Sequence, residues 1–375
     1  MRAHDARFPL VDALRAIAAL SVLAYHTAFV LGGLGGGGIG PWLAELNVGV
    51  VLFFAISGFL LYRPFVAARL GGMPRPDLRA YATRRFLRIV PAYWTALTLI
   101  ALATSKWSVF TPEGLLTYYG FLQSYRTETV VGGVGQAWTL GAEVAFYALL
   151  ALIAVVAVKG RAVMATTTRG EFAFLAGLLI ISVAWKVAVA ETVDPRSDDL
   201  LVLLIALPGQ LDHFVLGMAL AVVSVALATR EAPTPRIPRI IERAPVLPWM
   251  VAAAAFFVLG AGWQVGGETG RILGEHALEG VVALGLLVPA VIGADGGGAV
   301  RWLLARPFLA WTGLISYGVY LWHLDILRGL ADAGLAGWVV VLAGAVLSLS
   351  AGALSWYGVE RRALALGRRT VCRLP

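Results

Sequence analysis

Long apolar segments separated by short polar loops run through the whole chain. A membrane-spanning helix needs roughly 20 mostly apolar residues, and ten segments come close to that length: 10–31, 47–65, 84–103, 138–158, 171–190, 200–228, 249–264, 276–294, 307–327 and 337–357. The segment 110–125 is aromatic but polar, which favours a re-entrant or interfacial piece. The pattern therefore predicts an all-α, polytopic membrane helix bundle with about ten transmembrane helices.

Composition supports this prediction. Of the 375 residues, 59% are hydrophobic and 14% are charged, whereas soluble domains carry roughly 25% charged residues. The single cysteine, Cys372, excludes an internal disulfide and a cysteine-based metal cluster, and we expect no metal site. The first apolar run lacks a small-residue cleavage site, which indicates a retained helix. We expect one domain over 1–375, with a core at 8–362 and a basic cytoplasmic tail at 361–375.

The distribution of lysine and arginine predicts the orientation in the membrane. If the N-terminus is cytoplasmic, the outer loops hold only five cations: Lys106, Arg126, Arg196, Arg271 and Arg328. Most of the remaining cations fall in inner segments, as the positive-inside rule requires, so both termini are predicted to be cytoplasmic. The net charge of +8 reflects this orientation, and we expect no nucleic-acid partner because no basic soluble face is present. The proline-rich inner loop 229–248 suits a stiff extended connector.

Two ionisable residues, Arg15 and His26, lie inside the first apolar segment. Such residues are costly in the hydrocarbon region and mark a functional site by default. Their spacing of eleven is about three helical turns, so both side chains lie within about 20° of one face and about 16 Å apart. Asp12 lies near the same face. Because Arg15 and His26 cannot both reach one interface, we interpret them as parts of a site that spans much of the bilayer.

The predicted topology groups the candidate site residues into two layers. Two imidazoles and a carboxylate lie about four or five residues inside the outer ends of three different helices: His26, Glu143 and His323. Three guanidinium groups lie near the cytoplasmic face: Arg15, Arg85 and Arg88. Imidazoles and carboxylates suit acid–base work on a hydroxyl, and guanidinium groups are preferred partners of phosphates. The layers thus fit an anionic donor from the cytoplasm and an acceptor approached from outside.

Each candidate also has a purely structural interpretation. The arginines of the inner layer are alternatively anchors that reach lipid phosphates. Glu143 and His323 are alternatively packing partners between helices. We interpret Asp212 with His213 as a packing network. We interpret Glu360 with Arg361 as an ion pair at a helix end.

Six segments together are similar to motifs of one family. They are LVDALRAIAALSVLAYHTAF with its Arg, ten residues, then His; VVLFFAISGFLL at 50–61; RRFLRIVPAYW at 84–94; AWTLGAEVAFY at 137–147; SYGVYLWHL at 316–324; and YGVERR at 357–362. In this order they resemble the acyltransferase family 3 of integral membrane proteins, which acylate sugars, lipids or antibiotics. Val144 follows Glu143 where a second glutamate is common, and Gln210 stands where the family has arginine.

The resemblance implies ten helices, an acyl-CoA donor and transfer to a hydroxyl. It implies that His26 is catalytic and that the arginines, here Arg15, Arg85 and Arg88, handle the donor. Our hypothesis is that His26 acts as general base, that Glu143 or His323 orients or protonates it, and that an acyl-histidine is a possible variant.

The donor and acceptor are specified only by class. Acetyl-CoA is the default donor, and the acceptor candidates are a cell-envelope saccharide, a glycolipid and a macrolide-like secondary metabolite. We expect the protein to lie in the lipid bilayer of the bacterial inner membrane and to deliver the acyl group directly to its acceptor. The alternative function is a proton-coupled transporter that uses buried His and Glu residues as a relay, although the two halves of the chain show no convincing similarity.

Overall fold

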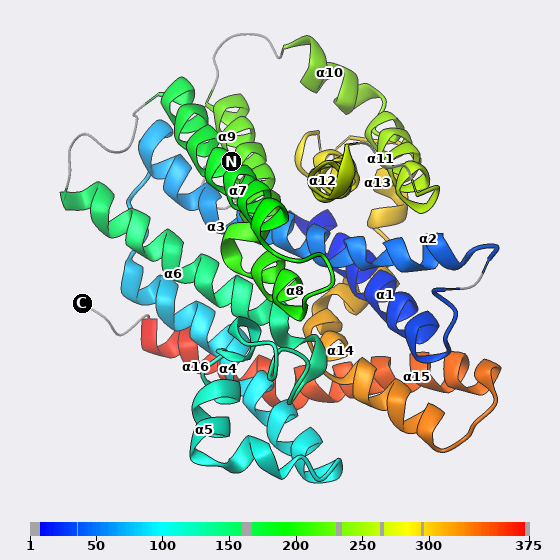
Figure 1. Ribbon diagram of the computed structural model, residues 1–375. Helices are drawn as coiled ribbons and strands as arrows, with labels where there is room; N and C mark the ends of the chain where they lie inside the picture. Colours follow the sequence, from blue (N-terminus) through cyan, green and yellow to red (C-terminus); the bar gives the residue numbers. More distant parts are fainter. Residues whose placement is uncertain are drawn as a thin grey trace.

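The computed structural model describes residues 8–35, 37–159, 167–229, 235–262, 266–293 and 296–371. Over these ranges the chain forms helices and turns without a β-strand (Figure 1). The helices are α1 (Pro9–Val30), α2 (Gly40–Ala44), α3 (Val48–Leu70), α4 (Leu78–Ala103), α5 (Pro112–Gly114), α6 (Trp138–Lys159), α7 (Thr168–Thr192), α8 (Asp198–Ile205), α9 (Leu207–Ala228), α10 (Arg236–Arg243), α11 (Val246–Gly260), α12 (Gly267–Val291), α13 (Ala299–Leu304), α14 (Pro307–Asp332), α15 (Gly337–Ser355) and α16 (Arg361–Val371).

The long helices confirm the predicted all-α membrane fold. Within the described ranges, eight helical segments are long and apolar enough to cross a membrane, and they contain α1, α3, α4, α6, α7, α9, α12 and α15. A ninth candidate is the pair of α10 and α11, which meet at 90°. The predicted span 307–327 corresponds to α14, a 26-residue helix whose tryptophans, tyrosines, histidine and aspartates keep it outside that set. The protein is thus a multi-pass membrane protein.

The proline-rich loop differs from its prediction. Residues 236–243 form α10 instead of an extended connector. Pro238 lies in the first turn of this helix, where backbone N–H groups have no intrahelical acceptor, so proline is tolerated there. The segment 110–125 forms a series of short helical turns, among them α5, a π-turn at Leu115–Tyr119 and a 3-10 turn at Gln123–Tyr125.

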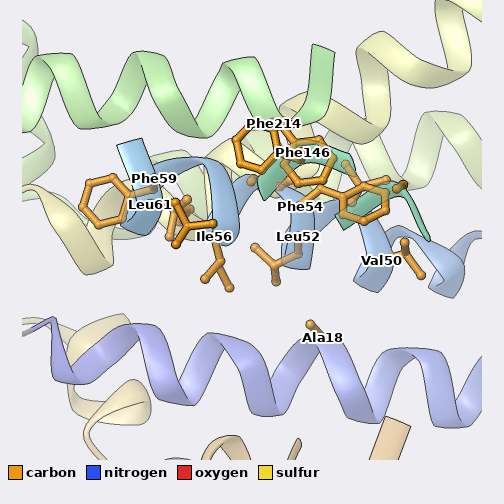
Figure 2. Close-up of a cluster of buried hydrophobic side chains, with 14 of the residues drawn as sticks. Ala18, Val50, Leu52, Phe54, Ile56, Phe59, Leu61, Phe146 and Phe214 are labelled. Carbon is orange, nitrogen blue, oxygen red and sulfur yellow. The ribbon is translucent and has the colours of Figure 1, made fainter. Parts of the chain in front are cut away.

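An aromatic cluster joins α3, α6 and α9 in the core (Figure 2). The ring of Phe214 stacks on those of Phe54 and Phe146, with centroids 4.6 and 4.1 Å apart. The backbones of α3 and α9 nearly touch, because a Cβ added to Gly217 would lie 1.9 Å from the carbonyl oxygen of Ala55. Small residues permit such close helix packing in membranes. The cluster holds α3 against α6, the two helices that also carry Ser57 and Glu143.

The helix α1 packs along α14 with a similarly close contact. A Cβ added to Gly313 would lie 1.7 Å from the carbonyl oxygen of Asp12, so only glycine fits at this point. The buried face of α1 is lined by small and branched apolar side chains such as Leu14 and Ala18. This packing fixes both the position and the rotation of α1 relative to α14.

Replacing Gly313 with Ala should force the two helices apart. Overpacking of this kind costs about 1–3 kcal/mol, and we expect a lower melting temperature for the purified variant in detergent. Gly177→Ala in α7 is the matched control, because its added Cβ meets no atom within 4 Å. Equal melting temperatures for the two variants would contradict the close contact of α1 with α14.

Candidate active site

His26 of α1 and His323 of α14 form a histidine pair. Their Nδ1 and Nε2 atoms, respectively, lie 3.0 Å apart, and the ring centroids are 4.9 Å apart. His323 is 1% exposed, whereas His26 is half-buried. The sequence placed both residues in one outer layer, and the structure brings them into direct contact.

The backbone around the histidine pair determines its hydrogen-bond directions. Nδ1 of His323 lies 2.9 Å from the carbonyl oxygen of Tyr320 and 3.1 Å from that of Val319. Carbonyl oxygens only accept, so in the neutral ring we assign the proton to Nδ1, which leaves Nε2 as an acceptor. That acceptor receives the Nδ1–H of His26, which also faces the carbonyl of Val22 at 3.1 Å. By this assignment, Nε2 of His26 keeps its lone pair and is available as a base.

The ring of His26 lines a cavity of about 130 Å³, here called the His26 cavity. Its wall is mostly aromatic and aliphatic: Tyr25, Phe29, Val130, Val131, Trp138, Leu201, Ile205 and Leu324. Gly135, Gln136 and Arg328 complete it. A base beside a largely apolar wall with a few polar groups is typical of small-molecule sites.

A second cavity of about 140 Å³, here called the arginine cavity, contains the other candidates. The predicted inner layer lines it together with Glu143: Arg15, Arg85 and Arg88. Glu143 accepts hydrogen bonds from Ser57, at 2.8 Å, and from the hydroxyl of Tyr147. Glu143 therefore shares a cavity with the arginines, whereas its expected neighbours His26 and His323 do not line that cavity.

Two of the three arginines are paired with carboxylates. Arg15 binds Asp12 at 2.9 Å, and Arg88 binds Glu360 at 3.3 Å. The guanidinium of Arg88 also lies over the rings of Tyr317 and Trp356. Glu360 ends a π-helical turn, Trp356–Glu360, between α15 and α16, and it is 1% exposed. The prediction that Glu360 pairs with Arg361 is therefore wrong, since the π-turn directs its buried carboxylate towards α4.

Arg85 differs from its two neighbours. It has no hydrogen-bond or ion-pair partner among the residues that the structure describes, and its Nε atom is buried. The guanidinium lies 5.9 Å from the centroid of the Tyr147 ring. Because a buried cation without a partner is costly, this position favours binding of an external anion.

The arginine cavity adjoins a wider space of about 540 Å³, here called the mouth. Arg15, Arg85 and Arg88 line both, and Arg84, Asp12 and Trp356 also line the mouth. Four guanidinium groups around one opening suit an anion with several phosphates.

A hydrogen-bonded wall lies between the arginine cavity and the His26 cavity. The hydroxyl of Tyr320 contacts Thr139 at 2.7 Å and donates to the carbonyl of Gln136 at 2.8 Å. The amide of Gln136 in turn donates to the carbonyls of Tyr320 and Leu321. Tyr320 and Thr139 line the arginine cavity and Gln136 lines the His26 cavity. The two spaces are thus separate and share one polar wall, whereas the sequence predicts that Arg15 and His26 belong to one site that spans much of the bilayer.

The predicted packing network around Asp212 and His213 is confirmed. Asp212 pairs with the ammonium group of Lys186, and His213 contacts the carbonyl of His276 at 3.3 Å. One ligand atom each from Asp212, His213 and His276 lie within 4.8 Å of one another. However, the two imidazole rings are parallel within 4°, so their lone pairs point along parallel planes, and Lys186 occupies one side of the carboxylate. This geometry suits an ion-pair network better than a shared metal ion.

The sequence does not predict several residues that lie around the site. Ser57, Gln136, Tyr320 and Arg328 carry no signal that separates them from ordinary polar residues of membrane helices. Tyr320 lies within the SYGVYLWHL segment, one turn before His323, which is the sole hint. Their importance comes from contacts between distant helices.

The fold and the site define a polytopic membrane protein with a histidine pair beside a largely apolar cavity and a separate cavity lined by three arginines. Residues 8–357 match the family model described as an acyltransferase domain, that of acyltransferase family 3. The chain belongs to this family and is an acyltransferase.

Three curated relatives illustrate the similarity. Nodulation protein 10 of Rhizobium leguminosarum bv. viciae is 24% identical over 390 residues, which cover 96% of this chain and 95% of that protein. The exopolysaccharide production protein ExoZ of Rhizobium meliloti is 29% identical over 331 residues, or 85% and 90% of the two chains. The peptidoglycan O-acetyltransferase OatA of Listeria monocytogenes is 23% identical over 350 residues, 85% of this chain but 49% of that protein. This chain thus spans about half the length of OatA. No solved structure matches the chain.

The contrast between Arg88 and Arg85 leads to a stability prediction. Arg88→Met leaves the buried carboxylate of Glu360 without its ion pair, so we expect a clear fall in melting temperature. Arg85→Met removes a cation that has no carboxylate partner among the described residues, and it should leave the melting temperature unchanged or higher.

A double-mutant cycle with Glu360→Gln measures the pair itself. Removing both charges should recover part of the loss, with a coupling energy of about 0.5–3 kcal/mol. Strictly additive effects of Arg88→Met and Glu360→Gln would show that the pair contributes nothing to stability.

Proposed function

We propose that this protein is an O-acyltransferase of the bacterial inner membrane, which moves an acyl group, acetyl by default, from cytoplasmic acyl-CoA to a hydroxyl of a saccharide, a glycolipid or a macrolide-like metabolite. The name of the relative OatA, a peptidoglycan O-acetyltransferase, supports acetyl transfer to a saccharide. The name of the exopolysaccharide production protein ExoZ supports the saccharide as acceptor class. The observation that carries the proposal is the hydrogen-bonded pair of His26 and His323.

The chemistry follows from the hydrogen-bond directions of the pair. Nε2 of His26 takes the proton of the acceptor hydroxyl while the hydroxyl oxygen attacks the thioester carbonyl carbon. The new C–O bond forms, the C–S bond breaks, and the departing CoA thiolate takes the proton from the imidazolium. His323 acts on His26, since its Nε2 accepts the Nδ1–H and stabilises the imidazolium. An acyl-histidine on His26 is the variant, and mass spectrometry of the protein with donor alone would detect it.

The arginine cavity is proposed to hold the donor. Arg85 supplies the charge that lacks a carboxylate partner in the described part of the chain, while Arg15 and Arg88 supply two further guanidinium groups at the same mouth. Glu143 lies in this cavity with Ser57 and Tyr147. We propose that it balances the positive charge and orients the pantetheine arm, and that His323 is the group that orients His26.

The proposed reaction requires the wall of Tyr320, Thr139 and Gln136 to open. The thioester has to pass this wall to reach His26, so transfer requires the hydroxyl of Tyr320 to leave Thr139 or the carbonyl of Gln136. Keeping the two cavities apart until then protects the thioester from water, a common use of closure steps in enzymes.

Replacing His26 with Ala should reduce acyl transfer by about 10²–10⁴-fold, the usual contribution of a general base. His323→Leu should give a smaller loss, because the base remains but loses its acceptor. His323→Gln keeps a side-chain acceptor and should retain more activity than His323→Leu. The measurement is transfer from radiolabelled acetyl-CoA to envelope saccharides by the purified protein in proteoliposomes.

Unchanged melting temperatures would show that these variants are folded. Near-normal transfer by folded His26→Ala would refute the general-base assignment. Uptake of saccharide into the same vesicles without any acyl donor would favour the transporter alternative.

A truncated donor tests the role of Arg85. Acetyl-pantetheine carries the same thioester as acetyl-CoA but none of its phosphates. Arg85→Met should raise KM for acetyl-CoA about tenfold or more, as expected for a lost charge-assisted hydrogen bond, and leave KM for acetyl-pantetheine unchanged. An equal change for both donors would mean that Arg85 does not bind phosphate.

A further inference from the structure

Arg328 brings a positive charge without a partner to the His26 cavity. The side chain is half-buried and lines this cavity, yet no residue of the described ranges forms a hydrogen bond or ion pair with it. Of the other four cations that the sequence placed in outer loops, Arg196 is exposed and the remaining three have carboxylate partners. Lys106 binds Asp325, Arg126 binds Glu113, and Arg271 binds Glu268 and Glu275. Arg328 therefore differs from these cations in a way that points to a ligand.

The position of Arg328 is set by the helix that carries His323, the hydrogen-bond partner of His26. Both His323 and Arg328 belong to α14, five residues or about 7–8 Å apart along its axis. The Nη1 atom of Arg328 lies 3.5 Å from where a Cβ on Gly135 would be, and Leu324 lies equally close. The guanidinium therefore lies within van der Waals reach of Gly135, at the wall of the cavity that Gln136 also lines.

The aromatic residues that line the His26 cavity indicate which class of ligand fits there. Tyr25 and Phe29 present nearly parallel rings with centroids 6.4 Å apart, and Trp138 lines the same cavity. Aromatic surfaces suit the apolar face of a ring-shaped ligand, while a guanidinium binds carboxylates and phosphates through paired hydrogen bonds. One ligand that satisfies both is an acidic saccharide.

We propose that Arg328 is a specificity-determining residue that selects acceptors carrying a carboxylate or phosphate near the reacting hydroxyl. This inference rests on the proposed function for the identity of the ligand as the acceptor. The anionic group binds Arg328, the sugar ring lies against the aromatic wall, and the hydroxyl is held towards His26.

Binding without turnover tests this inference directly. The protein is placed in nanodiscs of phosphatidylcholine, and calorimetry compares hexyl β-D-glucuronide with hexyl β-D-glucoside, which differ only in the carboxylate at C6. A third probe, the 6-phosphate of hexyl β-D-glucoside, distinguishes phosphate from carboxylate as the favoured anion. We expect at least one anionic probe to bind about tenfold or more tightly than the neutral probe, as one charge-assisted hydrogen bond allows.

Four variants test whether Arg328 causes the preference for anionic probes. Arg328→Gln should bind the anionic and neutral probes equally, and Arg328→Lys should keep part of the preference. Arg126→Gln, which removes the same charge from an exposed residue, should bind like the wild type. His26→Ala should retain the preference although its transfer is lost, so failure of the catalytic proposal and failure of this one are distinguishable.

Four results would overturn the inference. Equal binding of all probes by the wild type, or an undiminished preference in Arg328→Gln, would show that Arg328 does not recognise the anion. A lower turnover of the neutral glucoside in Arg328→Gln, without any binding preference in the wild type, would instead assign Arg328 to stabilisation of the oxyanion in the transition state. Displacement of the glucuronide by phosphatidylglycerol would assign the cavity to a lipid phosphate.

Discussion

The packing of α1 against α14 is the constraint on which the rest of the site depends. At one end, Gly313 lets the backbone of α14 touch that of α1 at Asp12, next to Arg15. Towards the other end, the same contact brings His26 onto His323. Because a helix is rigid over three turns, one close contact fixes the position of both ends. Arg15 and the pair of His26 and His323 are therefore held in register by a single helix pair.

The arginines around the two cavities fall into two groups, those paired with a carboxylate and those without such a partner. Cations are costly in a membrane protein unless they are paired or line a cavity with access to water, and the arginines meet this requirement in different ways. Arg88 is paired with Glu360 and Arg15 with Asp12, while Arg85 and Arg328 each face a cavity without such a partner in the described residues. The two unpaired cations lie on opposite sides of the Tyr320 wall, one in each cavity. This pattern fits a reaction that joins two ligands, each with its own anionic group, across one polar barrier.

The sequence predicts those features that depend on residues close together in the chain. The apolar runs predict the long helices, and the spacing of Arg15 and His26 predicts their common face. The contacts that build the site connect residues far apart: His26 meets His323 across 297 positions, and Arg88 meets Glu360 across 272. No helical period encodes such pairs. Glu143 shows the same limit, since its position near the start of α6 was predicted but its partner Ser57 depends on how the aromatic cluster holds α3 against α6.

Local chemistry also overrides simple composition at two points. Proline enrichment in 229–248 suggests an extended segment, yet a proline in the first turn is compatible with α10. Glu360 beside Arg361 suggests a neighbouring ion pair, yet one π-turn rotates the carboxylate towards α4. In both cases the outcome depends on where a residue lies within a helical turn, which composition does not specify.

The central claim is that donor and base meet across the wall next to Tyr320. Its most direct test is a cryo-electron microscopy structure of the protein with a non-hydrolysable thioether analogue of acetyl-CoA. The account predicts phosphates on Arg85 and Arg88, a displaced Tyr320 hydroxyl, and the carbonyl carbon of the analogue facing Nε2 of His26 with room for one acceptor oxygen between them. Phosphates bound elsewhere, or an acyl group held away from His26 while Tyr320 stays bonded to Thr139 and Gln136, would contradict it.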